Sequence, residues 1–183
     1  MNKSDEKNRA GYLKLIIIVG LVLLFDQASK LVILKTLPLY HSVTVISGFF
    51  DITHVQNPGG AFGFLSDQSP VVRNIIFILI SFLATCLIFY FYKNTPKTHP
   101  LLSAAFALIL GGAAGNLIDR VRFGKVIDFL DFYIGNLHWP AFNIADDFYI
   151  GNLHWPAFNI ADSAISIGMT ILLFHMIFKK MPE

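Results

Sequence analysis

Three aspartates, Asp119, Asp128 and Asp162, are the residues of this chain best suited to acid–base chemistry. When two carboxyl groups lie a few ångströms apart they cannot both ionise easily, so one keeps a proton while the other is charged. The ionised group can deprotonate a water that attacks a peptide carbonyl, and its protonated partner can donate to the carbonyl oxygen and the leaving amine. Because such a pair titrates as a unit, neither proton is assigned to one residue.

Other hydrolytic schemes lack their residues. The sequence contains no G-x-S-x-G and no H-E-x-x-H, and its six histidines do not have the spacing of a zinc site. Its single cysteine, Cys86, lies in an apolar run and excludes a disulfide framework or a multi-thiolate metal site. The carboxylate chemistry needs no metal or cofactor, and we expect none.

Each polar residue near an apolar run also has a structural interpretation. An aspartate at a helix N-terminus is usually a cap, and an asparagine in a membrane helix usually bonds a neighbouring helix. Asn116 and Asp119 are three residues apart, as are Asn159 and Asp162, so each pair shares a helix face. The aspartates are predicted to converge at one membrane surface, and this clustering favours chemistry over capping.

Asp26 and Lys30, at i and i+4, also share one helix face. A charged residue in a membrane is costly unless it is paired or hydrated. We favour an internal Asp26–Lys30 pair that fixes helix packing over a direct chemical role for either residue.

The composition indicates that these residues are held in a membrane. The chain of 183 residues is 55% apolar, with eighteen Phe and only 14 basic and 12 acidic residues. So much apolar surface cannot be hidden inside a soluble globule of this size, and the balanced charge gives no basic face for nucleic acid. The composition therefore excludes a soluble domain and a nucleic-acid partner.

Four apolar stretches are long enough to cross a bilayer, which takes roughly 20 residues. They cover residues 15–34, 75–92, 101–118 and 159–178. We predict an all-α integral membrane protein of one membrane-embedded domain over residues 1–183. In the third span, Gly111 and Gly115 form a G-x-x-x-G spacing that lets a neighbouring helix approach closely.

The distribution of Lys and Arg predicts the orientation. Both termini and the 93–100 link carry Lys or Arg, whereas 38–70 and 126–160 carry none. Both termini are therefore expected in the cytoplasm, and the two long loops, 38–70 and 119–158, on the outside. The first loop holds β-branched and aromatic runs beside the turn NPGG, which predicts a small extracytoplasmic β-sheet.

The second loop contains an identical repeat. Residues 131–146 read DFYIGNLHWPAFNIAD, and residues 147–162 repeat them without a change. Two short copies cannot stack a core of their own. A recent tandem duplication, or an error in the sequence, explains the repeat better than a functional array.

Five motifs resemble those of the bacterial lipoprotein signal peptidases (signal peptidase II), and they occur in the family's order relative to the four spans. They are DQASK from Asp26, QNPGGAFG from Gln56, GNLIDR ending at Arg120, VIDF from Val126, and FNIADSAI. The resemblance implies a four-helix membrane aspartyl protease of the bacterial inner membrane. Its substrates would be diacylglyceryl-modified prolipoproteins, cut before the lipidated cysteine, with membrane lipid around a monomeric enzyme.

The resemblance also implies roles for residues. The aspartates of VIDF and FNIAD would be the catalytic pair, Asp128 and Asp162. The residues that hold peptide or lipid would be Asn57, Asn116, Arg120 and Asn159, and the supporting polar residues Asp26, Lys30 and Asp119.

The duplication leaves two candidates for the second catalytic aspartate. Asp162 is continuous with the fourth span, whereas Asp146 precedes DFYIGN, which cannot enter the bilayer as a helix. We therefore favour Asn159 and Asp162 over Asn143 and Asp146. The alternative keeps the short connection from Asp128 to Asp146 and places the extra residues before the fourth helix.

Two other functions compete with proteolysis. Intramembrane acids also mark proton paths, so a small proton-coupled transporter component is one alternative. A scaffold in which Asn, Asp and Gly serve only helix packing is the other. The acids gather at one surface and no inverted repeat of helices is visible, which favours the protease.

Overall fold

A computed structural model describes residues 3–59, 68–96, 98–134, 137–138 and 157–178. The chain divides into two compact units, each built from segments far apart in the sequence. The first unit comprises residues 1–26, 81–116 and 160–183, and the second comprises residues 27–80 and 117–159. The prediction of one membrane-embedded domain over 1–183 stays a prediction.

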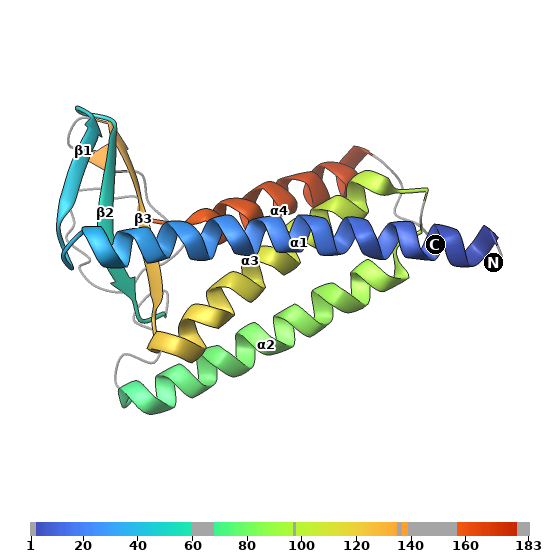
Figure 1. The fold of residues 1–183 in the computed structure, drawn as a ribbon, viewed down its shortest axis with the longest axis horizontal. Helices are drawn as coiled ribbons and strands as arrows, with labels where there is room; N and C mark the ends of the chain where they lie inside the picture. Colours follow the sequence, from blue (N-terminus) through green and yellow to red (C-terminus); the bar gives the residue numbers. More distant parts are fainter. Residues whose placement is uncertain (1–2, 60–67, 97, 135–136, 139–156, 179–183) are drawn as a thin grey trace. The chain divides into compact units, whose positions relative to one another are not determined.

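Four long helices are the main elements of the chain (Figure 1). They are α1 (Lys3–Thr36), α2 (Pro70–Asn94), α3 (Pro100–Phe123) and α4 (Ile160–Phe178). Each is long and apolar enough to cross a membrane. The prediction of a multi-pass membrane protein with four spanning helices is therefore confirmed. Helices suit a bilayer because each satisfies its backbone hydrogen bonds internally.

Three helices extend well beyond the predicted spans. α1 begins at Lys3, before the predicted start at residue 15. α2 begins at Pro70, before the predicted start at Ile75, and α3 continues past Ile118 to Phe123. The end of α3 is a glycine cap, since Gly124 has a φ of 71° and donates its N–H to the carbonyl of Arg120 at 3.0 Å. The outer loop predicted from residue 119 therefore starts with helix.

The first unit packs the helices around an apolar core. Leu15, Tyr92, Leu102, Phe106, Ala107 and Leu110 form its buried cluster. The Tyr92 hydroxyl lies inside this unit and donates to the carbonyl oxygen of Gly11 at 2.7 Å. A phenol with an apolar body and a bonded hydroxyl can be buried at an interface between helices without an unsatisfied polar atom.

Glycines on α3 allow neighbouring helices to approach its backbone. A Cβ on Gly111 would lie 2.9 Å from Val22 of α1, and one on Gly112 would collide with the carbonyl oxygen of Ala161 in α4. A Cβ on Gly115 would lie 2.7 Å from the Asp26 carboxylate of α1. The close approach predicted from the G-x-x-x-G spacing is confirmed, and it extends to α4 through Gly112.

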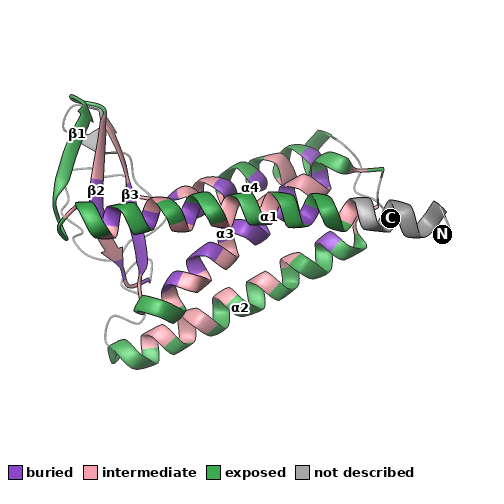
Figure 2. Cartoon of the chain, viewed as in Figure 1, coloured by how far each residue is buried: buried purple, intermediate pink, exposed green. Residues whose placement is uncertain are grey.

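Exposed apolar side chains cover much of the helices, as the burial colours in Figure 2 show for α1 and α2. Leu83 in α2 is 65% exposed and Ile16 in α1 is 66% exposed. Such surface would be costly in water but is the expected lipid-facing surface of a membrane helix.

The second unit contains the β-sheet. Its strands are β1 (Ser42–Ile46), β2 (Phe50–Asn57), β3 (Val126–Ile134) and β4 (Leu137–His138), in the order β1-β2-β3-β4, and all neighbours are antiparallel. The small sheet predicted for the first loop is confirmed. β3 was not predicted, because its run VIDFLDFYI has apolar and acidic residues on both faces and so lacks the alternation of a half-buried strand.

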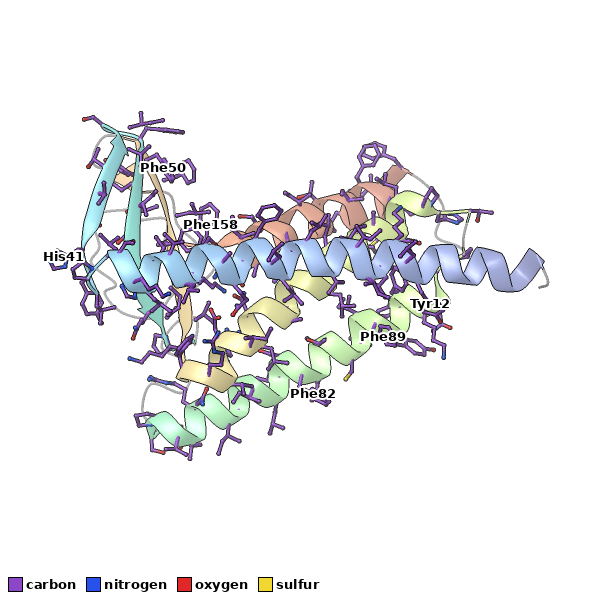
Figure 3. The ribbon with its side chains drawn as sticks, viewed as in Figure 1. Tyr12, His41, Phe50, Phe82, Phe89 and Phe158 are labelled. Atoms are coloured by element: carbon purple, nitrogen blue, oxygen red, sulfur yellow. The ribbon has the colours of Figure 1, made fainter. Side chains whose placement is uncertain are left out.

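The chain returns from the second loop onto the sheet at Phe158. Phe158 forms a bridge with Leu130, accepting its N–H at 2.7 Å and donating to its carbonyl at 2.9 Å. The Phe132 ring stacks on Phe50 at 4.4 Å and on Phe158 at 5.8 Å between centroids; Phe50 and Phe158 are labelled in Figure 3. These contacts fix the position of Phe158, the residue directly before Asn159.

Candidate active site

Asp128 lies on β3 in the second unit, opposite Val55 of β2 in the sheet register. Only 1% of the residue is exposed. Its Oδ2 accepts a hydrogen bond from Asn57 Nδ2 at 3.1 Å, and its Oδ1 accepts one from Asn159 Nδ2 at 2.7 Å. Buried carboxylates need such donors, and here both donors are residues that the sequence predicted for the site.

The side chain of Asn57 is oriented by a second contact. Its Oδ1 accepts the backbone N–H of Gly59 at 2.8 Å, so its NH₂ group must face Asp128. Gly59 has a φ of 83°, and a Cβ there would lie 3.0 Å from the Phe77 ring of α2. The turn after β2 therefore needs glycine, both for its backbone conformation and for the space beside Phe77.

Asp119 is fully buried and is surrounded by donors. Its Oδ2 lies 2.7 Å from Lys30 Nζ and accepts the backbone N–H of Ile127 at 3.2 Å, and its Oδ1 accepts Gln27 Nε2 at 2.9 Å. Lys30 is itself 2% exposed. The pair thus neutralises two charges inside the unit and holds the strand that carries Asp128. The predicted pairing of Lys30 with Asp26 stays a prediction.

Asp162 lies in the first turn of α4, in the first unit. Its Oδ1 accepts a hydrogen bond from Asn116 Nδ2 of α3 at 2.7 Å. Asn116 is 7% exposed, whereas Asp162 is half-buried. A carboxylate in the first turn also interacts favourably with the positive end of the helix dipole.

Asp26 supports the same helix from α1. It is fully buried, and its Oδ1 accepts the backbone N–H of Ala161 at 3.0 Å. This N–H belongs to the first turn of α4, where backbone donors have no partner within their own helix. Asp26 is therefore a cap for α4 supplied by another helix, one residue before Asp162.

Arg120 lies on α3 in the second unit, with its Cζ 5.9 Å from the centroid of the Phe77 ring. This distance is at the outer limit for a cation–π contact. The neighbouring Arg122 donates to Gln27 Oε1 at 3.3 Å, which extends the hydrogen-bonded group around Asp119.

Several contacts of these residues were not predicted from the sequence. Gln27, Gly59 and Phe77 had no predicted role, although Gln27 lies within the motif DQASK and Gly59 within QNPGGAFG. The other copy of the repeat, with Asn143 and Asp146, lies outside the described residues. Among the residues that the structure describes, no group of three or more His, Cys, Asp or Glu side chains could hold a metal.

Comparison with known proteins places this arrangement in a family. The family model described as Signal peptidase (SPase) II matches residues 18–150 and 147–178. The chain is 44% identical to the lipoprotein signal peptidase of Desulforapulum autotrophicum, over 96% of this chain and 99% of the relative. It is 43% identical to that of Syntrophus aciditrophicus, over 90% and 92%.

Solved structures of bacterial membrane enzymes have a similar fold. One described as a bacterial membrane enzyme has a TM-score of 0.73 and 30% identity, covering 91% of this chain and 94% of that one. A second has a TM-score of 0.69 and 32% identity, over 92% and 93%. The fold is that of a multi-pass membrane enzyme. The chain belongs to the signal peptidase II family, and it is therefore a peptidase.

The two family matches also reflect the repeat. The first includes residues 131–146, and the second begins at Asp147, the first residue of the second copy. Each match thus contains one complete copy of the repeat, and the two matches overlap at residues 147–150.

Proposed function

We propose that this protein is an aspartyl endopeptidase that removes signal peptides from diacylglyceryl-modified prolipoproteins, cleaving before the lipidated cysteine. The reaction would take place at the membrane surface of a bacterial inner membrane, on the side opposite the two cytoplasmic termini. Its relatives are lipoprotein signal peptidases. Because the chain belongs to a family of peptidases, proteolysis is favoured over the transporter and scaffold alternatives.

Asp128 and Asp162 are the proposed catalytic pair. The observation that carries the proposal is the hydrogen bond from Asn159 to the buried carboxylate of Asp128, because Asn159 precedes Asp162 by only three residues. The short segment 159–162 therefore contains both a hydrogen-bond donor to Asp128 and the second aspartate of the proposed pair. Each aspartate also accepts an amide N–H from a further asparagine, Asn57 for Asp128 and Asn116 for Asp162.

In the proposed reaction one carboxylate of the pair removes a proton from water as the water oxygen attacks the scissile carbonyl carbon. The other carboxyl group donates its proton to the carbonyl oxygen. Collapse of the tetrahedral intermediate breaks the C–N bond. The leaving amine takes a proton from the pair while a hydroxyl of the intermediate returns one to it, so the pair ends with the single proton with which it began. Neutral asparagine amides suit this cycle, since they keep hydrogen bonds to the pair without adding a charge.

The substrate would reach the site from the membrane. Its acyl chains would stay in the bilayer beside the exposed apolar faces of the helices while the peptide bond lies at the surface. Asn57, Asn116, Arg120 and Asn159 are the proposed contacts for peptide or lipid headgroup. Asp26, Lys30 and Asp119 are proposed to support the site through the cap of α4 and the buried ion pair.

Cleavage of a purified, diacylglyceryl-modified prolipoprotein tests this proposal. We expect Asp128→Asn and Asp162→Asn each to lower the rate by roughly 10²–10⁴-fold, the usual contribution of a general acid or base. Both variants should remain folded, because asparagine keeps the size of the side chain and one oxygen acceptor. Full activity in Asp128→Asn would overturn the proposal.

The repeat supplies a matched control. Asp146→Asn makes the same chemical change at the same position of the other copy. If Asp162 is the partner of Asp128, Asp146→Asn cleaves at the normal rate. Loss of cleavage in Asp146→Asn with normal cleavage in Asp162→Asn would assign the first copy instead.

A further inference from the structure

Gln27 of α1 contacts the buried Asp119 on one side and an arginine of α3 on the other. Its Nε2 donates to Asp119 Oδ1 at 2.9 Å, and its Oε1 accepts a hydrogen bond from Arg122 at 3.3 Å. Arg122 is exposed at the end of α3, whereas Asp119 is fully buried. Within the second unit, the half-buried Gln27 side chain therefore joins a surface cation to a buried carboxylate.

Only one orientation of the Gln27 amide suits both contacts. The NH₂ group of an amide only donates, and its carbonyl oxygen only accepts. Turning the amide over would place its oxygen against the Asp119 carboxylate and its NH₂ group against the Arg122 guanidinium, so both contacts would become repulsive. The amide is thus held with its donor toward Asp119, and an ionised glutamate or a lysine at this position would lose one of the two contacts.

Gln27 and Lys30 together hold both oxygens of Asp119. The two residues are three apart on α1 and share a helix face. Lys30 Nζ lies 2.7 Å from Asp119 Oδ2, whereas Gln27 donates to Oδ1. Oδ2 also accepts the backbone N–H of Ile127 at 3.2 Å. One turn of α1 therefore fixes the plane of the Asp119 carboxylate relative to Ile127.

The plane of this carboxylate bears on the proposed catalytic residue. Ile127 directly precedes Asp128, and both are buried at the start of β3. If Gln27 is replaced, Oδ1 of Asp119 loses its donor, and a buried acceptor without a donor is costly. Rotation of the carboxylate toward another donor would then move Oδ2 away from Ile127. A displacement of about 1 Å costs an aligned reaction roughly 100-fold in rate.

We propose that Gln27 is a positioning residue for cleavage. It holds Asp119 in the orientation that binds the backbone N–H next to Asp128. This role rests on the proposed function, in which Asp128 belongs to the catalytic pair. Gln27 is not among the proposed contacts for peptide or lipid headgroup, so its loss should lower kcat and leave KM unchanged.

Cleavage of a diacylglyceryl-modified prolipoprotein by the full-length protein tests this role. Gln27→Leu should lower kcat about tenfold or more, the effect of one hydrogen bond to a charged group, without changing KM. Gln68→Leu makes the same substitution at an exposed position before α2 and should leave both constants unchanged. Thermal unfolding of each variant checks that it is folded.

Gln27→Glu separates the donated hydrogen bond from packing. An ionised glutamate still accepts from Arg122 but repels Asp119. A protonated glutamate can donate its O–H to Asp119 and accept from Arg122 with its other oxygen, as the amide does. The kcat of Gln27→Glu, divided by that of the unaltered protein at each pH, should therefore rise severalfold as the pH is lowered from about 8 to about 5, where carboxyl groups begin to take up protons. The same ratio should stay constant for Gln68→Glu and for Gln27→Leu.

Hydrogen exchange measures the effect without cleavage. The N–H of Ile127 is bonded to Asp119, so exchange in the segment 126–129 should be faster in Gln27→Leu than in the unaltered protein. Exchange in this segment should be unchanged in Gln68→Leu. Mass spectrometry of the detergent-solubilised protein reads the exchange of this segment.

Three results would each overturn the proposal: equal kcat in Gln27→Leu and Gln68→Leu, a Gln27→Glu ratio that does not change with pH, or unchanged exchange in the segment 126–129. If Gln27→Leu does not fold, the pH series on one preparation of Gln27→Glu still decides. Asp128→Asn, assayed in parallel, tests the proposed function itself. Full activity of Asp128→Asn would remove that function, whereas the exchange at Ile127 would still show whether Gln27 holds Asp119.

Discussion

The carboxylate of Asp119 accepts a hydrogen bond from the backbone N–H of Ile127 at 3.2 Å, and Ile127 directly precedes Asp128. The same oxygen lies 2.7 Å from the ammonium of Lys30. An ion pair between α1 and α3 therefore holds the start of β3, and with it the backbone of the proposed catalytic residue.

The effects of replacing Lys30 and Asp119 on the free energy of unfolding should be strongly coupled, because the two side chains form a buried ion pair. Removing one partner leaves a buried charge without its counter-ion, so Lys30→Met and Asp119→Asn should each lower the free energy of unfolding by about 3–5 kcal/mol. Unfolding of the detergent-solubilised protein measures this. The double variant should lose clearly less than the sum of the two, and additive losses would show that the pair is not coupled.

Asn57 should matter for catalysis through its bond to Asp128. Asn57→Leu removes a hydrogen bond to a charged group, worth about 1.5–3 kcal/mol, so kcat/KM for a lipid-modified prolipoprotein should fall roughly 10- to 150-fold. Asn94→Leu makes the same change at an exposed position near the end of α2 and should be neutral. Equal effects of the two variants would contradict the assigned role.

The contact between α3 and α4 at Gly112 should tolerate no side chain. Gly112→Ala places a methyl group against the carbonyl oxygen of Ala161, and overpacking of this kind costs about 1–3 kcal/mol. Because Asp162 follows Ala161, cleavage should also slow.

Gly20→Ala is the control for the glycine variant. Gly20 lies in α1 with nothing within 4 Å of its Cβ position, so alanine should stabilise the helix by up to about 1 kcal/mol. Thermal unfolding compares the two variants. A neutral Gly112→Ala would show that α3 and α4 do not pack this closely.

Tyr133 should titrate above the ordinary value for a tyrosine. Burial raises the pKa of its phenol, and a hydrogen bond at 3.0 Å to the charged Asp51 raises the pKa further. Because the folded state favours the protonated phenol, this stabilisation is present below the ordinary pKa of 10.0 and is lost as pH rises through the raised value.

Ultraviolet absorbance during a pH titration measures this pKa, with Tyr133→Phe identifying the contribution of Tyr133. Asp51→Asn should lower the pKa of the phenol toward its ordinary value. A pKa that does not respond to Asp51→Asn would contradict the assigned cause.

The spanning helices could be predicted from the sequence because hydrocarbon imposes a minimum length of apolar residues. Their ends could not, since polar residues such as Asp119 and Arg120 continue α3 beyond the apolar run. Asp119 and Asp162 were likewise placed on the correct helices, whereas Asp128 lies on β3, a strand that was not predicted. The partners of these aspartates were harder to predict. Asp26, four residues before Lys30, was the expected partner of Lys30, whereas the described ion pair of Lys30 is with Asp119 on another helix.

The strand β3 shows a similar limit. Its run VIDFLDFYI alternates poorly, with apolar and acidic residues on both faces, and its pairing with β2 becomes visible only when the two loops are brought together. Likewise, nothing local predicts that the Asn57 amide lies between Gly59 and Asp128.

The bridge between Leu130 and Phe158 makes the number of residues between them nearly irrelevant to the position of Asn159. Closing a flexible loop of twice the length costs only about 0.6 kcal/mol more. The clasp at Leu130 and Phe158 thus sets where the chain enters α4, whatever number of residues separates the two, and Asn159 keeps its bond to Asp128.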